Sequence, residues 1–260
     1  MSLRQTTREI IKQVEITSGF RVEVQKDPDL PVLATVRKAR PPVPAHFVIY
    51  KPSTGEEPDF LICYQCAFIL RLFTNPPGQR FDIGALPDGY SEVSRQLSKP
   101  GGISDQLGLD STTTEEYSRK LVNGLIVHLR SIPVGLRIHE WFDKNYPEFH
   151  ELQRRQMIKE VNEGRSSLEP DIKPLFPSMI YDATIAINAA LALFAGPKCD
   201  QPELAAPYRF GGYLENGEKL LRIWEKLPDD PTHDCALIDS WAENLGIRNW
   251  YHWIPYEPPL

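Results

Sequence analysis

The chain has 260 residues, of which 41% are hydrophobic and 25% are charged, and its formal net charge is −6. This length and composition allow a sizeable core and are typical of a globular protein. The negative charge argues against nucleic-acid binding through phosphate contacts and against attachment to an anionic membrane surface.

The first part of the chain predicts a helix followed by a small β-layer. Residues Thr6–Thr17 have the apolar spacing of a short amphipathic helix, which Gly19 should end. Three strand-like segments follow, at Phe20–Val24, Pro31–Val36 and His46–Tyr50.

An almost wholly apolar helix is predicted next, at Phe60–Phe73, and we expect the rest of the fold to be organised around it. Asp59 is well placed as its N-cap. Residues Thr74–Thr114 are rich in Pro, Gly and Ser, which predicts irregular structure with short helices inside it, such as Tyr90–Leu97.

From Thr114 onward the pattern is helical. The predicted helices are Thr114–Arg130, Pro133–Tyr146, Pro147–Asn162, Ser178–Ala195, Gly212–Lys226 and His233–Leu245. The apolar run Met179–Gly196 contains Asp182 and Asn188, so we interpret it as a buried helix and not as a membrane span. The aromatic tail Trp250–Tyr256 should dock on the body of the protein.

These elements predict an α+β fold dominated by helix, with a small N-terminal β-layer packed on a buried helix and a helical C-terminal region. We expect a single domain over residues 1–260, or a division into residues 1–110 and 111–260. Residues 1–13 lack the apolar run of a signal peptide, so we expect a soluble, cytoplasmic protein with reduced cysteines.

The order of helix, three strands and apolar helix in Thr6–Phe73 resembles the core of zincin metallopeptidases, in particular the ImmA/IrrE family. In such enzymes the apolar helix carries His-Glu-x-x-His, whose two histidines bind Zn²⁺ while the glutamate polarises a zinc-bound water. Here the same three positions hold Tyr64, Gln65 and Phe68. The third ligand of the family, an acid on a later helix, falls on Ala186, two residues before Asn188.

The resemblance therefore implies a zincin-like scaffold, a pseudo-metallopeptidase, that has lost both metal and hydrolysis. Tyr64 and Phe68 would fill the space of the ion.

Cys63 and Cys66 form a second candidate site on the same helix. Side chains at i and i+3 share one face, so the two thiols could form half of a zinc site or a redox pair. The pair lies about one turn inside the helix, and cysteine is among the most buried residue types, which favours inert core thiols. Cys199 and the segment His233–Cys235 would have to supply further zinc ligands.

Several other polar residues are candidates. His128, His139 with Glu140, and His150 could form a metal site if their helices fold back on one another, although hydrogen-bonded or solvated histidines are the simpler interpretation. Arg71 lies on the apolar helix and must reach solvent or pair with an acid such as Asp82.

The sequence contains no serine nucleophile elbow, phosphate loop or dinucleotide fingerprint. We therefore expect a non-catalytic binding or regulatory module with no cofactor, whose partner is a protein or a small molecule; a homo-oligomer is compatible with the sequence. The ligand-binding candidates are Tyr64, Gln65 and Arg71. No metal site is favoured. The weak candidates for metal ligands are Cys63, Cys66, His139 and Glu140.

The alternative is an enzyme of unrecognised type. Its site would lie under the loops of residues 74–114 or near the helices that carry His128, His139 and His150.

Overall fold

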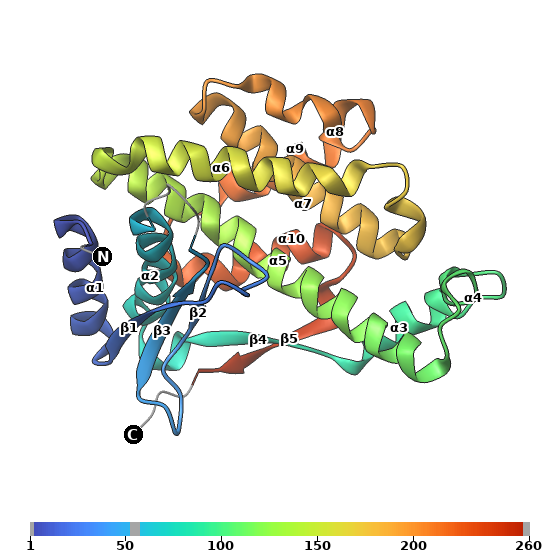
Figure 1. Cartoon of the computed structure of the whole chain (residues 1–260), viewed down its shortest axis with the longest axis horizontal. Coiled ribbons are helices and arrows are strands. Elements are labelled where there is room, and N and C mark those ends of the chain that lie inside the picture. The colour runs from blue at the N-terminus through green and yellow to red at the C-terminus, as the bar shows by residue number, and fades with distance from the viewer. Residues whose placement is uncertain (1–2, 53–57, 257–260) are drawn as a thin grey trace. The chain divides into compact units, whose positions relative to one another are not determined.

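A computed structural model of the chain describes residues 3–52 and 58–256 and has the predicted α+β, helix-dominated fold (Figure 1). The chain forms two compact units. Unit 1 comprises Met1–Asp82, Ile138–Gln153 and Pro255–Leu260, and unit 2 comprises Ile83–Arg137 and Arg154–Ile254. These units reflect only which residues pack together. The expectation of a single domain over residues 1–260, or of a division after residue 110, therefore stays a prediction.

Unit 1 contains the predicted β-layer and apolar helix. In chain order its elements are α1 (Gln5–Ser18), β1 (Arg21–Lys26), β2 (Ala34–Arg37), β3 (Ala45–Tyr50), α2 (Asp59–Thr74) and the short 3₁₀ helix η1 (Pro77–Gln79). The three strands form one sheet in the order β1-β3-β2, with β1 parallel and β2 antiparallel to β3. Helices α1 and α2 pack against each other and against the sheet (Figure 1).

The local sequence accounts for the C-terminal end of α1. Gly19 follows the helix with a φ of 80° and donates its N–H to the carbonyl of Glu15. This left-handed conformation costs glycine little, so the predicted stop is confirmed.

The predicted N-cap role of Asp59 is wrong. Asp59 is the first residue of α2, and its buried carboxylate accepts the hydroxyl of Thr7 and the backbone N–H of Arg4. It therefore satisfies donors at the start of α1 instead of those of its own helix, a partnership that depends on packing and not on local sequence.

Unit 1 is completed by the last turns of α5 (Ser111–Asn145), the 3₁₀ helix η2 (Pro147–Phe149) and the first turn of α6 (His150–Arg165). The sequence predicts two helices in place of α5, separated before Pro133, but the helix is continuous with Pro133 inside it. The apolar face continues on both sides of Pro133, and its burial offsets the cost of about 3 kcal/mol that an internal proline carries. The helix begins after Asp110, whose side chain accepts the N–H of Thr113.

Unit 2 is built mainly of helices. Its helices are α3 (Pro87–Leu97), α4 (Ile103–Leu107), the greater part of α5 and α6, α7 (Ser178–Lys198), α8 (Ala206–Phe210), α9 (Leu214–Lys226) and α10 (Asp234–Asn244). Short 3₁₀ helices lie between or after them: η3 (Ser166–Leu168), η4 (Lys173–Leu175), η5 (Pro202–Ala205), η6 (Pro231–His233) and η7 (Arg248–Trp250). Helices α7 and α9 lie side by side (Figure 1).

The region Thr74–Thr114 is more regular than predicted. The helix expected at Tyr90–Leu97 is confirmed within α3, but β4 (Phe81–Ala85) was not expected. This strand pairs with β5 (Tyr251–Pro255) from the aromatic tail, which confirms that the tail docks. The partner of β4 lies far away in the sequence, so local periodicity does not predict that β4 is a strand.

Within the part of the chain that the structure describes, two helices, α5 and α7, are long and apolar enough to cross a membrane by length and composition alone. Their most apolar windows have mean hydropathies of 1.2 and 1.5, and 56% and 72% of these windows are buried inside the protein. Buried core helices pass the same test, so the two helices are weak indicators of a membrane protein.

The close approach of α9 to α7 depends on Gly217. A Cβ atom at this position would lie 2.8 Å from both the Cβ of Ala189 and the backbone nitrogen of Ala190. We expect Gly217→Ala to lower the free energy of unfolding by about 1–3 kcal/mol, because the two helices would have to separate. Chemical denaturation measures this change.

Gly124→Ala is the matched control, because Gly124 is exposed within α5 and a Cβ atom there would meet nothing within 4 Å. It should raise the free energy of unfolding by about 0.5–1 kcal/mol through helix propensity alone. Equal effects of the two substitutions would contradict the packing argument.

Candidate functional site

The candidate site of unit 1 is centred on Tyr64, which lies in the middle of α2 and is buried. The centre of its ring is 5.8 Å from that of Phe60, 5.4 Å from that of Phe68 and 4.9 Å from that of His139. Phe142 and Phe149 extend this group through Phe60. We call these side chains the aromatic cluster: Phe60, Tyr64, Phe68, His139, Phe142 and Phe149.

His139 enters the aromatic cluster from α5. Its ring is buried and also stacks on Phe60, with the ring centres 6.1 Å apart. The sequence marks His139 and Glu140 only as weak metal candidates, and the structure places the ring of His139 directly beside that of Tyr64. Glu140 is half-buried next to it in the chain.

The possible metal site of His128, His139 and His150 is split, because these three residues do not belong to the same unit. His150 is exposed at the start of α6, where its Nε2 lies 3.2 Å from the carbonyl of Asp143, and His128 belongs to unit 2. Within residues 3–52 and 58–256, no three His, Cys, Asp or Glu side chains lie together in a way that could hold a metal ion. Helix α7, which carries Ala186, also belongs to unit 2.

Gln65 lies at the edge of the sheet. Its side chain is half-buried, and its Nε2 is 3.5 Å from the backbone carbonyl of Ala34 on β2. The carbonyl of Leu33 accepts from Lys51, so the alternation of an antiparallel pair turns the backbone groups of Ala34 and Val36 away from β3. Gln65 therefore reaches the outer edge of β2.

Arg71 is half-buried later on α2. Asp82, considered from the sequence as its partner, pairs with Lys38 and Arg40. Both cations also lie over the ring of Tyr256. This carboxylate therefore helps to hold the last described residue of the chain against unit 1.

The two cysteines of α2 are fully buried. Burial raises the pKa of the Cys63 thiol to about 12, although a hydrogen bond with Thr7 opposes the shift. Burial also raises the pKa of the Cys66 thiol well above its ordinary value. Zinc binding and thiol redox chemistry both require thiolates, so this environment favours the interpretation of Cys63 and Cys66 as core residues.

Sequence reasoning missed His46, the most deeply buried polar side chain on β3. Its Nδ1 accepts the backbone N–H of Ala39 at 3.0 Å, and Nε2 has no hydrogen-bond partner among the described residues. The rings of Phe20 and Phe73 meet the imidazole edge to face. The only signal in the sequence is a histidine at the start of an apolar strand.

Ala39, in the segment Lys38–Arg40, contacts both His46 and Tyr256. The N–H of Ala39 binds His46, and its carbonyl accepts the hydroxyl of Tyr256. Burial, assisted by the charge of Lys38, lowers the pKa of His46 to about 4. His46 is therefore neutral at physiological pH and serves as an acceptor.

No family model, curated protein or solved structure matches the chain significantly.

The lowered pKa of His46 predicts a loss of stability in acid. The unfolded histidine titrates near 6.5 and the folded one near 4, so the unfolded chain binds more protons between these pH values. The free energy of unfolding should fall as the pH drops from 6.5 to 4, by up to about 3 kcal/mol from this group. Denaturation at a series of pH values measures the slope.

His46→Asn keeps an acceptor for Ala39 and removes the titration, so it should reduce this slope. Some slope will remain, because burial also lowers the pKa of His128 to about 4. The exposed His252 gives the control His252→Asn, which should leave the slope unchanged. An unaltered slope in His46→Asn would show that His46 is not the group responsible.

Proposed function

We propose that this protein is a non-catalytic, metallopeptidase-like module that binds an extended segment of a partner protein along β2, beside Tyr64 and Gln65, in the cytoplasm. The observation that carries the proposal is the position of Gln65. It occupies the place of the family's catalytic glutamate and reaches the outer edge of the sheet at Ala34.

The surroundings of Tyr64 favour binding over hydrolysis. Neither Tyr64 nor Phe68 has the imidazole that the zincin mechanism requires, and both rings pack in the aromatic cluster. Gln65 cannot accept a proton from water as a glutamate can, but its amide both donates and accepts hydrogen bonds. These residue types recognise a ligand without activating a nucleophile.

The edge of β2 supports a protein segment as the ligand. β2 is the last strand of its sheet, and Ala34 and Val36 direct backbone groups away from β3. An extended segment can add to such an edge through main-chain hydrogen bonds, with side-chain pockets supplying specificity. Gln65 is the polar side chain of α2 that lies at this edge, and the sequence adds Tyr64 and Arg71 as further candidates on the same helix.

The resemblance to a metallopeptidase core can be tested by restoring its metal ligands. The triple variant Tyr64→His, Gln65→Glu, Phe68→His recreates the family motif on α2. His139, whose ring centre is 4.9 Å from that of Tyr64, would supply a third nitrogen ligand. We expect the purified variant to bind about one zinc ion per chain, measured by elemental analysis, with circular dichroism to verify folding.

Leu61→His, Gln65→His is the control, because it places the same i, i+4 pair on a different face of α2. It should bind much less zinc. A folded triple variant without zinc would contradict the proposed register, and stoichiometric zinc in the unmodified protein would contradict a non-catalytic role.

The binding mode predicts a specific effect of proline on β2. Peptides that bind the protein can be selected from a displayed library and their affinities measured by calorimetry. Val36→Pro removes an N–H that faces away from β3, so the sheet keeps its internal bonds while an added strand loses one. We expect affinity to fall about tenfold, the value of one well-made hydrogen bond.

Val36→Thr keeps both the N–H and a branched side chain, so it should bind as tightly as the unmodified protein. Selected peptides that bind Val36→Pro equally well would place the binding surface away from β2.

A further inference from the structure

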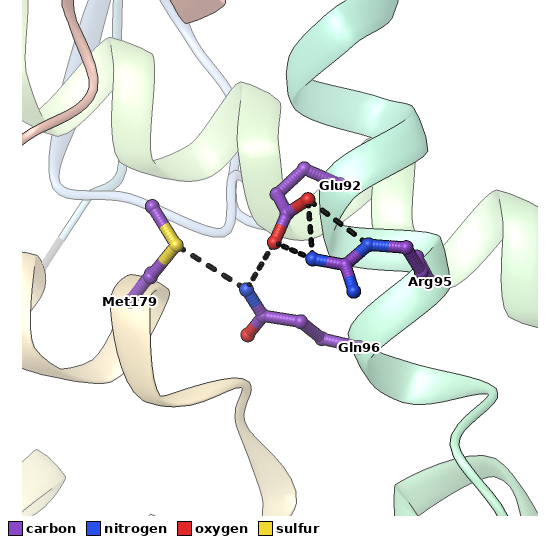
Figure 2. Close-up of polar contacts among 4 residues, drawn as sticks. All are labelled: Glu92, Arg95, Gln96 and Met179. Carbon is purple, nitrogen blue, oxygen red and sulfur yellow. Dashed lines mark hydrogen bonds and ion pairs between the residues drawn. The ribbon is translucent and has the colours of Figure 1, made fainter.

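A chain of polar contacts in unit 2 ends on a sulfur atom. On α3, Arg95 Nη2 lies 2.7 Å from Glu92 Oε1, and Gln96 Nε2 lies 2.8 Å from the same oxygen. Gln96 Nε2 is also 3.2 Å from the Sδ atom of Met179, in the first turn of α7. Figure 2 shows the amide nitrogen between the carboxylate and the thioether.

The orientation of the Gln96 amide is fixed by chemistry. An ionised carboxylate only accepts hydrogen bonds, so the nitrogen and not the oxygen of the amide must face Glu92. The hydrogen bond from Arg95, together with that from Gln96, lowers the pKa of Glu92 and keeps it ionised. The second N–H of Gln96 therefore points toward Met179, whose sulfur is only a weak acceptor.

The two methionines within the described residues differ in exposure. Met179 is half-buried, whereas Met157 on α6 is only 1% exposed. Methionine oxidation depends on access of the oxidant to the side chain, so we expect Met179 to be the more reactive of the two. A sulfoxide oxygen is a much stronger acceptor than a thioether, and a donor already faces this side chain.

We propose that Met179 is an oxidation site whose sulfoxide is held by Gln96. A peroxide transfers one oxygen atom to sulfur: the O–O bond breaks, the S–O bond forms, sulfur loses two electrons and hydrogen peroxide leaves as water. The flexible side chain then rotates so that the new oxygen accepts the Gln96 N–H. The contact between α3 and α7 is thereby kept, and the change is reversible by methionine sulfoxide reductases.

Selectivity is tested on the full chain with hydrogen peroxide, by following both methionines with peptide mass spectrometry. In the native protein we expect Met179 to oxidise at least about tenfold faster than Met157, and in denaturant both should react at similar rates. Native Met157 reacting as fast as Met179 would overturn the site.

Recognition by Gln96 is tested by comparing unfolding temperatures before and after oxidation. The drop should be larger in Gln96→Leu than in the unmodified protein, because the sulfoxide loses its donor. The control Gln106→Leu removes an exposed glutamine on α4 and should behave as the unmodified protein. Met179→Leu should show no drop.

Treatment with a sulfoxide reductase should restore the original unfolding temperature. Equal drops in Gln96→Leu and in the unmodified protein would overturn the role of Gln96, and a drop in Met179→Leu would assign the effect to another residue.

Discussion

The structure of unit 1 depends on the need to bury most of the surface of α2. Most helices have one polar face, but the buried residues of α2 cover most of its circumference, and the half-buried residues Gln65, Phe68, Arg71 and Leu72 lie along one side. One neighbour cannot cover such a helix, so α1, the sheet and the end of α5 all pack against it. The same constraint explains Asp59. A carboxylate at the buried end of this helix needs donors, and Thr7 and the N–H of Arg4 provide them.

Much of this fold follows from periodicity. Residue spacing predicts α1, the three strands of the sheet, and the apolar helices α2 and α7, because these patterns report directly on burial. The errors have a common origin in partners that are distant in sequence. Strand β4 needs β5, and α5 continues through Pro133 because packing stabilises both halves. Local propensity contains neither effect.

For the candidate site, the sequence correctly predicts the burial of Cys63 and Cys66. The metallopeptidase register of Tyr64, Gln65 and Phe68 stays a prediction. The neighbour of Tyr64 was not predictable, because His139 approaches from a helix more than seventy residues later. His46 was missed for a different reason. A histidine at the start of a strand gives no local sign of burial, because its neighbours Ala39, Phe20 and Phe73 come from other parts of the chain. Burial, assisted by the charge of Lys38, then lowers its pKa and keeps it neutral.

In the proposed function, Gln65 explains why a scaffold that has lost its metal keeps a polar side chain at this position. A glutamate there without zinc would place an uncompensated negative charge in a half-buried position on an apolar helix. Glutamine has nearly the same shape, carries no charge and presents the donor and acceptor of a peptide group. Beside the outward-facing backbone of β2, such an amide matches the hydrogen-bonding needs of an added strand. In the proposed function, the substitution that removes catalysis is therefore also the one that suits the site to binding.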